Sequence, residues 1–110
     1  MSKRDDTLLI GDIVHSLNAI QHYTKGMTYD DFLNNQMCID AVIRNFEIIR
    51  EAANYISPDF KSIHPEIEWQ KFTDFRNRLI YHYFGINYEI VWEVIENEVG
   101  TFLQLFETLR

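Results

Sequence analysis

The residues best suited to chemistry in this sequence lie in one short segment, residues 74–85. The segment combines two guanidinium groups, a carboxamide, an imidazole and two phenols, carried by Arg76, Asn77, Arg78, Tyr81, His82 and Tyr83. An imidazole transfers protons near neutral pH, and arginine stabilises negative charge on phosphoryl oxygens. Cleavage of a phosphodiester without a metal needs both functions. The segment is therefore our candidate for a catalytic site.

The same residues also allow structural interpretations. Arg78 and His82 are four residues apart, a spacing at which polar side chains commonly share the exposed face of a helix. Arg76 alone would more often be a salt-bridge partner than a phosphate ligand, and Tyr81 or Tyr83 could simply pack on a neighbouring helix. The density of such groups beside fixed positive charge favours the functional interpretation.

Composition indicates one helical domain over residues 1–110. Of the 110 residues, 46% are hydrophobic and 15% aromatic, enough for a single core, and the chain has only four glycines and two prolines. The lone cysteine, Cys38, excludes an internal disulfide and is compatible with a reducing compartment. We find no signal peptide and no apolar run near the roughly 20 residues that span a membrane. We therefore expect a cytoplasmic protein without a membrane segment.

The formal net charge of −7 disfavours a broad nucleic-acid footprint, which usually rests on clustered lysine and arginine. Any RNA contact must then be local, near Lys71, Arg76 and Arg78, or lie in a groove between subunits. His15 and His22 have no third ligand nearby, so they are a weak metal signal. The sequence has no glycine-rich phosphate loop. We expect no metal and no cofactor.

Apolar residues at helical spacing predict an all-α fold, an antiparallel four-helix bundle with one additional short helix. Thr28, followed by Asp31, is predicted to cap the short helix, and Asn87 the last one. Gly85 is predicted to end the helix that carries the candidate site. A loop is expected at residues 57–66. The five helices are expected at about residues 4–24, 28–34, 35–57, 67–84 and 87–110.

The candidate segment resembles a known signature. The FRNRL of residues 75–79, followed by the HYF of residues 82–84, is similar to the signature of the HEPN superfamily, and most of all to HepT-like toxins of prokaryotic toxin–antitoxin pairs. Further similarity follows in order along most of the chain, at residues 40–45, 51–53, 64–69 and 88–92.

The resemblance implies a helical-bundle ribonuclease that acts on RNA without a metal, as a homodimer or a higher oligomer. It also implies a partner nucleotidyltransferase that silences the toxin by adding AMP to a tyrosine, matched here by Tyr83. Arg76 and Asn77 match the arginine and its polar neighbour. We assign proton transfer to His82 and treat Arg78 and Tyr81 as accessory candidates.

The histidine departs from the HepT-like pattern, in which four residues separate the arginine from the histidine. Tyr81 stands at that position, and His82 follows one residue later. In a straight helix this shift turns the imidazole by about 100°, whereas Tyr83 would return to within about 20° of Arg76. A loosened last turn, a π-bulge or pairing across a dimer would compensate for the shift.

The main hypothesis is therefore a metal-independent endoribonuclease toxin that cleaves RNA by attack of the ribose 2′-OH and is neutralised by AMPylation. The alternative is a non-catalytic helical subunit that binds a nucleotidyltransferase or its nucleotide, which the shifted histidine and the acidic charge favour. A third hypothesis, a structural helical dimer with an incidental motif, is the weakest.

Overall fold

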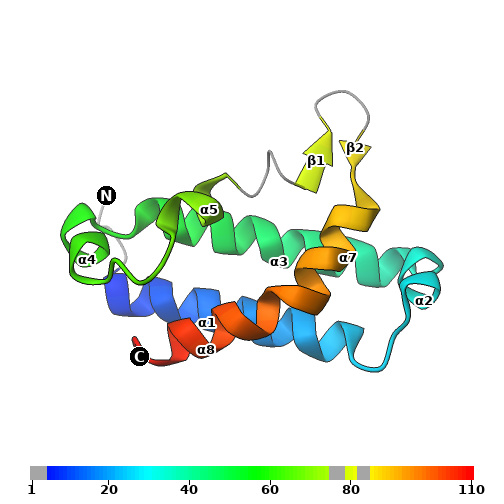
Figure 1. Ribbon diagram of the computed structural model, residues 1–110, viewed down its shortest axis with the longest axis horizontal. Coiled ribbons are helices and arrows are strands. Elements are labelled where there is room, and N and C mark those ends of the chain that lie inside the picture. Colours follow the sequence, from blue (N-terminus) through cyan, green and yellow to red (C-terminus); the bar gives the residue numbers. More distant parts are fainter. Residues whose placement is uncertain (1–4, 75–78, 82–84) are drawn as a thin grey trace.

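The computed structural model describes residues 5–74, 79–81 and 85–110, with residues 80 and 81 described by their backbone. The fold is all-α apart from one short antiparallel strand pair, which confirms the predicted class (Figure 1). The described elements are, in chain order, α1 (Asp6–Thr24), α2 (Tyr29–Leu33), α3 (Gln36–Tyr55), α4 (Pro58–Ile63), α5 (Trp69–Thr73), β1 (Ile80–Tyr81), β2 (Gly85–Ile86), α7 (Tyr88–Asn97) and α8 (Val99–Glu107).

The two longest helices, α1 and α3, lie side by side and run antiparallel (Figure 1). At one end of the pair, the backbone N–H and the hydroxyl of Ser57 donate to the Asp6 carboxylate at 2.9 and 2.7 Å. At the other end, the Cys38 thiol lies 3.7 Å from the carbonyl oxygen of Tyr23. Helix α8 packs along α1 on another side, and α5 packs on α3. The predicted antiparallel arrangement is confirmed.

The core is built from the apolar stripes that the sequence predicts. Residues at helical spacing on α1 and α3 are almost completely buried, and α8 adds Phe106, which has no exposed surface. Each such side chain contributes about 1.5–3 kcal/mol when it leaves water. The fully buried members on the two long helices include Ile10, Ile13, Leu17, Ile20, Val42, Ile49 and Ala53.

The helix starts follow the predicted capping residues. Thr28 Oγ1 accepts from the Asp31 backbone N–H at 3.1 Å, and the Asp31 carboxylate accepts from the Thr28 backbone N–H at 3.0 Å. Asn87 Oδ1 accepts from the backbone N–H of Ile90 at 3.2 Å, so Asn87 caps α7. Such a cap is worth about 1 kcal/mol because it satisfies N–H groups that have no partner inside the helix.

Two predicted boundaries were wrong. The expected loop at residues 57–66 contains α4, which forms because Ser57 Oγ accepts from the Phe60 backbone N–H and Pro58 occupies the first helical turn. The expected last helix is divided into α7 and α8 at Glu98, whose backbone (φ −122°, ψ −34°) departs from helical values.

The predicted helix over residues 67–84 was also wrong. Helix α5 ends at Thr73, and the backbone of Ile80 and Tyr81 forms β1, which pairs with β2 in the register Ile80 with Ile86 and Tyr81 with Gly85. Apolar and aromatic residues at this spacing suit both structures, and antiparallel pairing with β2, which begins four residues after β1 ends, decided between them. Gly85 belongs to β2 with φ +83°, so it is not the C-cap that we expected.

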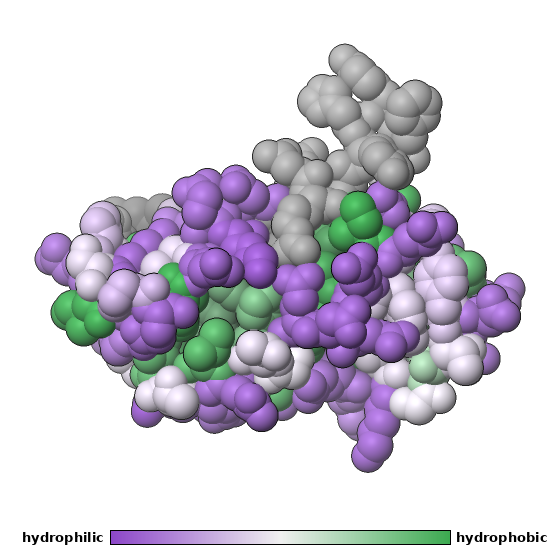
Figure 2. All heavy atoms as spheres, viewed as in Figure 1, coloured by the Kyte–Doolittle hydropathy of each residue, from purple (hydrophilic) through white to green (hydrophobic). Residues whose placement is uncertain are grey.

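The surface agrees with the acidic, polar composition. Figure 2 shows one face on which hydrophilic residues predominate and apolar residues gather in small patches. Among the helices of the described residues, none combines the length and the apolar character needed to cross a membrane.

Candidate functional site

Most of the predicted site lies outside the described residues. This holds for the three assigned catalytic residues, for one accessory residue and for the expected AMP acceptor, namely Arg76, Asn77, His82, Arg78 and Tyr83. Of the other accessory candidate, Tyr81, the backbone lies in β1 opposite Gly85. The structure does describe the elements on both sides of these residues, and they show how the candidate segment is held.

Helix α5, which precedes the segment, is held by aromatic packing on α8. Phe72 is 1% exposed, and its ring centroid lies 4.7 Å from that of Phe102 and 5.2 Å from that of Phe106 in edge-on contacts. The Trp69 ring contacts Phe106 in the same way at 5.7 Å. With only five residues and no side-chain cap, α5 cannot be stable alone. Its position therefore depends on its packing against α3 and α8.

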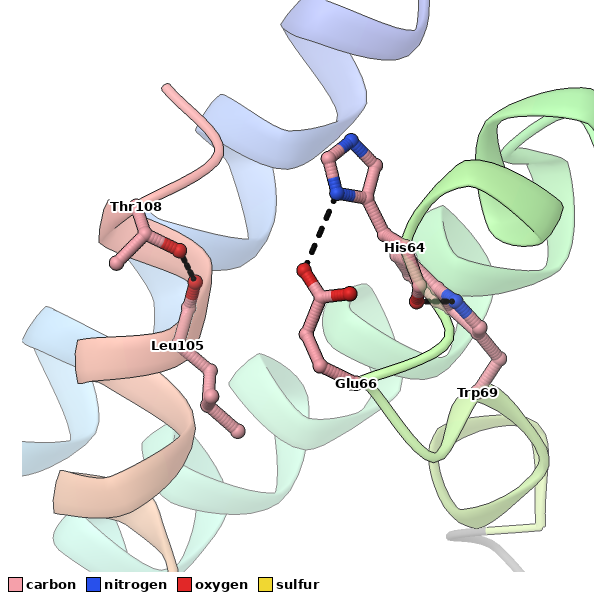
Figure 3. A network of polar contacts seen from close by, with 5 residues as sticks. All are labelled: His64, Glu66, Trp69, Leu105 and Thr108. Carbon is pink, nitrogen blue, oxygen red and sulfur yellow. Dashed lines mark hydrogen bonds and ion pairs between the residues drawn. The ribbon is translucent and has the colours of Figure 1, made fainter.

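The chain entering α5 is fixed by a small polar network (Figure 3). The Trp69 indole Nε1–H donates to the carbonyl oxygen of His64 at 3.0 Å, and His64 Nδ1 lies 3.2 Å from Glu66 Oε2. A hydrogen bond to its own backbone N–H, with a smaller contribution from His64, lowers the pKa of the Glu66 carboxyl. The His64 ring also lies 4.6 Å from the Phe60 ring, between centroids. His64 and Trp69 therefore fix the start of α5.

The other side of the segment is held by β1, β2 and α7. Leu79 is 3% exposed, and its carbonyl oxygen accepts from the backbone N–H of Asn87 at 2.8 Å. The same asparagine caps α7, so one residue joins the start of β1 to the start of that helix. Gly85 permits the left-handed φ of +83° at the start of β2. Both borders of the candidate segment are thus buried or hydrogen-bonded.

The strand at Ile80 and Tyr81 changes the geometry expected for the site. A continuous helix over residues 67–84 is excluded, and with it the angles of about 100° and 20° that helical geometry gave for His82 and Tyr83 relative to Arg76. The displacement of the histidine by one position therefore cannot be judged as a rotation about a helix axis. Its proposed compensation by a π-bulge loses its premise for the same reason.

The charged groups that border the segment are mostly acidic. Lys71 Nζ lies 3.3 Å from Glu68 Oε2 and 3.5 Å from Glu98 Oε1. The Asp74 carboxylate accepts from the Gln70 side-chain amide at 3.1 Å. Glu98 was not predicted from the sequence, because nothing local marks a glutamate that meets a lysine from another helix. Positive charge for a phosphate must come mainly from the arginines of the segment itself.

The described residues also form two surface grooves away from the predicted site. Within residues 5–74, 79–81 and 85–110, no three His, Cys, Asp or Glu side chains converge as metal ligands would. Two surface grooves have volumes of about 520 and 240 Å³, and the described residues lining them include none of the predicted site. The first is lined by Asn18, Gln21, His22, Thr24 and Lys25, and the second by Leu9, Asp12, Ile48, Glu51, Ala52 and Tyr55.

Comparison with known proteins gives a consistent result. The family described as Ribonuclease HepT-like matches residues 13–109. A protein of Methanocaldococcus jannaschii named "Putative RNase" is 42% identical over 99 residues, which cover 90% of this chain and 91% of that protein. The "Probable ribonuclease HepT" of Thermococcus cleftensis is 35% identical over 108 residues, which cover 98% of each chain. No solved structure gives a significant match.

Proposed function

Because the chain belongs to the HepT-like family of ribonucleases, we propose that it is a metal-independent endoribonuclease and the toxin of a cytoplasmic toxin–antitoxin pair. The family match over residues 13–109 carries the proposal, because it includes the whole segment with Arg76 and His82. The resemblance of that segment to the HEPN signature supplies the roles of the individual residues.

In the proposed reaction, His82 takes the proton from a ribose 2′-OH or gives one to the leaving 5′-oxygen. The 2′-oxygen attacks the adjacent phosphorus, and the bond to the 5′-oxygen breaks. The products are a 2′,3′-cyclic phosphate and a free 5′-hydroxyl. Arg76, assisted by Arg78, stabilises the charge on the phosphoryl oxygens, while Asn77 orients the imidazole or a phosphate oxygen. No step uses a metal ion.

The borders of the segment support this assignment. A catalytic arginine and histidine act efficiently only when they are held in a defined relation to the scissile bond. Here the segment begins beside the buried Phe72, and it returns to the bundle through β2 and the capped start of α7. Tyr81, whose backbone belongs to β1, is retained as an accessory residue.

We also propose that two copies assemble with their candidate segments across a shared cleft. Each chain carries a formal charge of −7, which repels RNA. Pairing the segments would double the local positive charge and offset this repulsion where the substrate binds.

The proposed regulation is AMPylation of Tyr83 by a partner nucleotidyltransferase. The phenol oxygen would attack the α-phosphorus of ATP, form a phosphodiester with AMP and release pyrophosphate. The resemblance supports Tyr83 as the acceptor because it stands seven residues after Arg76, as the modified tyrosine does in the HepT-like pattern. An AMP group there would place a phosphate near the arginines that otherwise bind RNA.

One observation favours the alternative, a non-catalytic subunit that binds the nucleotidyltransferase or its nucleotide. His82 stands one residue later than the histidine of the HepT-like pattern. A protein that had lost proton transfer could keep its partner and its arginines. This alternative predicts RNA or nucleotide binding without cleavage.

The deciding experiment incubates the purified protein with fluorescein-labelled RNA oligonucleotides in EDTA. We expect cleavage with 2′,3′-cyclic phosphate ends, lost in Arg76→Ala and His82→Ala. Loss in Tyr81→Ala with retention in His82→Ala would move proton transfer to Tyr81. Binding without cleavage by the unmodified protein would establish the alternative.

AMPylation is tested separately by intact-mass measurement after co-expression with the proposed partner nucleotidyltransferase. We expect an added adenylyl mass that is absent from Tyr83→Phe. An added mass that persists in Tyr83→Phe would place the modification elsewhere.

A further inference from the structure

Lys71 connects two elements of which one precedes and the other follows the candidate segment in the chain. Its ammonium group lies 3.3 Å from Glu68 Oε2 at the start of α5 and 3.5 Å from Glu98 Oε1 at the junction of α7 and α8. The same ammonium lies 5.8 Å from the centroid of the Phe102 ring on α8. One of its two ion pairs is therefore local to α5, and the other crosses to a different part of the fold.

The ion pair between Lys71 and Glu98 joins the helix before the candidate segment to the end of the helix after it. Lys71 is in the last turn of α5, three residues before Asp74, the first residue of the segment. Glu98 ends α7, the helix that follows β2, with its backbone N–H bonded to the Val94 carbonyl oxygen at 2.9 Å. The chain that leaves α5 at Asp74 thus returns through β2 and α7 to a carboxylate held by Lys71.

The aromatic contacts between α5 and α8 restrict the relative position of the two helices less than the ion pair does. Phe72 and Trp69 bury apolar surface against Phe102 and Phe106, which holds the two elements together. Apolar burial is not directional, so edge-on rings allow small sliding and rotation at little loss. The ion pair adds a second point of contact, between α5 and the end of α7, and so limits how far those movements can go.

The exposure of the pair argues against a mainly stabilising role. The Lys71 side chain is 38% exposed and the Glu98 side chain 20% exposed. Ion pairs in such settings contribute little to the free energy of unfolding. A small change in geometry can still have a large effect on catalysis, because rates depend steeply on the alignment of reacting groups.

We propose that Lys71 and Glu98 are positioning residues for RNA cleavage. Their ion pair sets α5 relative to the end of α7, the two helices that precede and follow Arg76 and His82 in the chain, and the rate of cleavage depends on that arrangement. The inference rests on the proposed ribonuclease function. It assigns neither residue a contact with RNA.

The test compares Lys71→Met, Glu98→Gln and the double variant in the full-length protein, using a fluorescein-labelled RNA oligonucleotide. Lys71→Met keeps an apolar side chain over Phe102 and removes the charge. We expect each single variant to lower kcat about 2- to 5-fold through misalignment, which is the most that an exposed ion pair can contribute, with KM changed less than about two-fold. The double variant should be no slower than the slower of the two single variants, because both changes remove the ion pair between Lys71 and Glu98.

The chain offers a matched control in the other partner of the same lysine. Glu68→Gln removes the local pair within α5, so it should leave kcat unchanged. Lys71→Arg, which keeps the positive charge, should retain most of the activity. The melting temperature of every variant, followed by circular dichroism, should match that of the unmodified protein.

Several outcomes would overturn the inference. These are unchanged kcat in Lys71→Met, losses that multiply in the double variant, an equal loss in Glu68→Gln, or a fall in kcat that follows the fraction of unfolded protein. If the unmodified protein cleaves no RNA, the proposed function fails and the inference falls with it. If that protein is active and Lys71→Met is equally active, only the inference fails.

Discussion

The α1–α3 pair and the part of the chain between α5 and α7 differ in how they are stabilised. Helices α1 and α3 have 19 and 20 residues, begin at side-chain caps and bury long apolar stripes against each other. The helix before the candidate segment has five residues and no side-chain cap, and the strands β1 and β2 have two residues each. Helices and strands this short are marginal in isolation.

This difference indicates that the two regions contribute differently to stability and to catalysis. The long helices derive their stability from cooperative hydrogen bonding and shared burial, so they can form without the candidate segment. The elements around the segment take their positions from contacts with α8 and with the start of α7. Substitutions in the first region should change mainly stability, and those in the second should also change catalysis.

The largest expected effect is on activity. Arg76→Ala or His82→Ala should lower the rate of RNA cleavage by at least about 100-fold, because each removes a group that acts in the transition state. Their melting temperatures should stay close to that of the unmodified protein. Arg110→Ala is the control, since Arg110 is exposed and pairs with Glu107 at the end of the chain. A comparable loss in Arg110→Ala would point to a general charge effect.

The next effect compares two buried phenylalanines. Phe72→Ala on α5 and Phe46→Ala on α3 should each lower the free energy of unfolding by about 3–5 kcal/mol, because both side chains are at most 2% exposed. Only Phe72→Ala should also lower kcat per folded molecule. Chemical denaturation and single-turnover cleavage measure the two quantities. Equal kcat in both variants would contradict the division between the two regions.

A smaller effect concerns the link between the ends of α1 and α3. Ser57→Ala removes the 2.7 Å hydrogen bond to Asp6 and the cap of α4. It should lower the free energy of unfolding by about 1–2 kcal/mol. The kcat of the folded protein should not change, because this link lies in the bundle. A clear fall in kcat would show that the bundle ends also influence the site.

Two glycines with positive φ provide a finer comparison. Gly85 (φ +83°) begins β2 and Gly26 (φ +76°) follows α1, and an added Cβ would meet no atom within 4 Å at either position. Alanine at each should lower the free energy of unfolding by about 1–2 kcal/mol through backbone strain alone. Gly85→Ala should also lower kcat, whereas Gly26→Ala should not. Identical kinetics would place β2 outside the functional region.

The smallest effect is the pH dependence of the loop before α5. The pKa of Glu66 is lowered in the folded protein, first by a hydrogen bond to its own backbone and then by His64. The ionised carboxylate therefore contributes stability above its unfolded pKa, and the contribution is lost as the pH falls through the folded pKa. Glu66→Gln should be slightly less stable at neutral pH, and the difference should vanish in acid. Thermal unfolding across pH measures this difference, and one that persists in acid would contradict it.

The sequence by itself determined the helices whose signals are local. The apolar spacing that predicted helices at about residues 4–24 and 35–57 gave α1 and α3 nearly as they are, because one buried stripe recurs every three to four residues. Thr28 and Asn87 were predicted as caps because a cap acts within three residues of itself. The family was likewise visible from the signature at residues 75–84 and from further similarity that follows in order along most of the chain.

Only the tertiary structure decided what surrounds the candidate site. The residues near Ile80 have the spacing of a helix, yet their backbone pairs with Ile86 and Gly85. Three further features could not be read from the sequence. They are the end of α5, the hydrogen bond between Leu79 and Asn87, and the ion pair between Lys71 and Glu98. Each joins groups that only the folded chain brings together, and a strand pair or an ion pair across elements leaves no periodic pattern in the sequence.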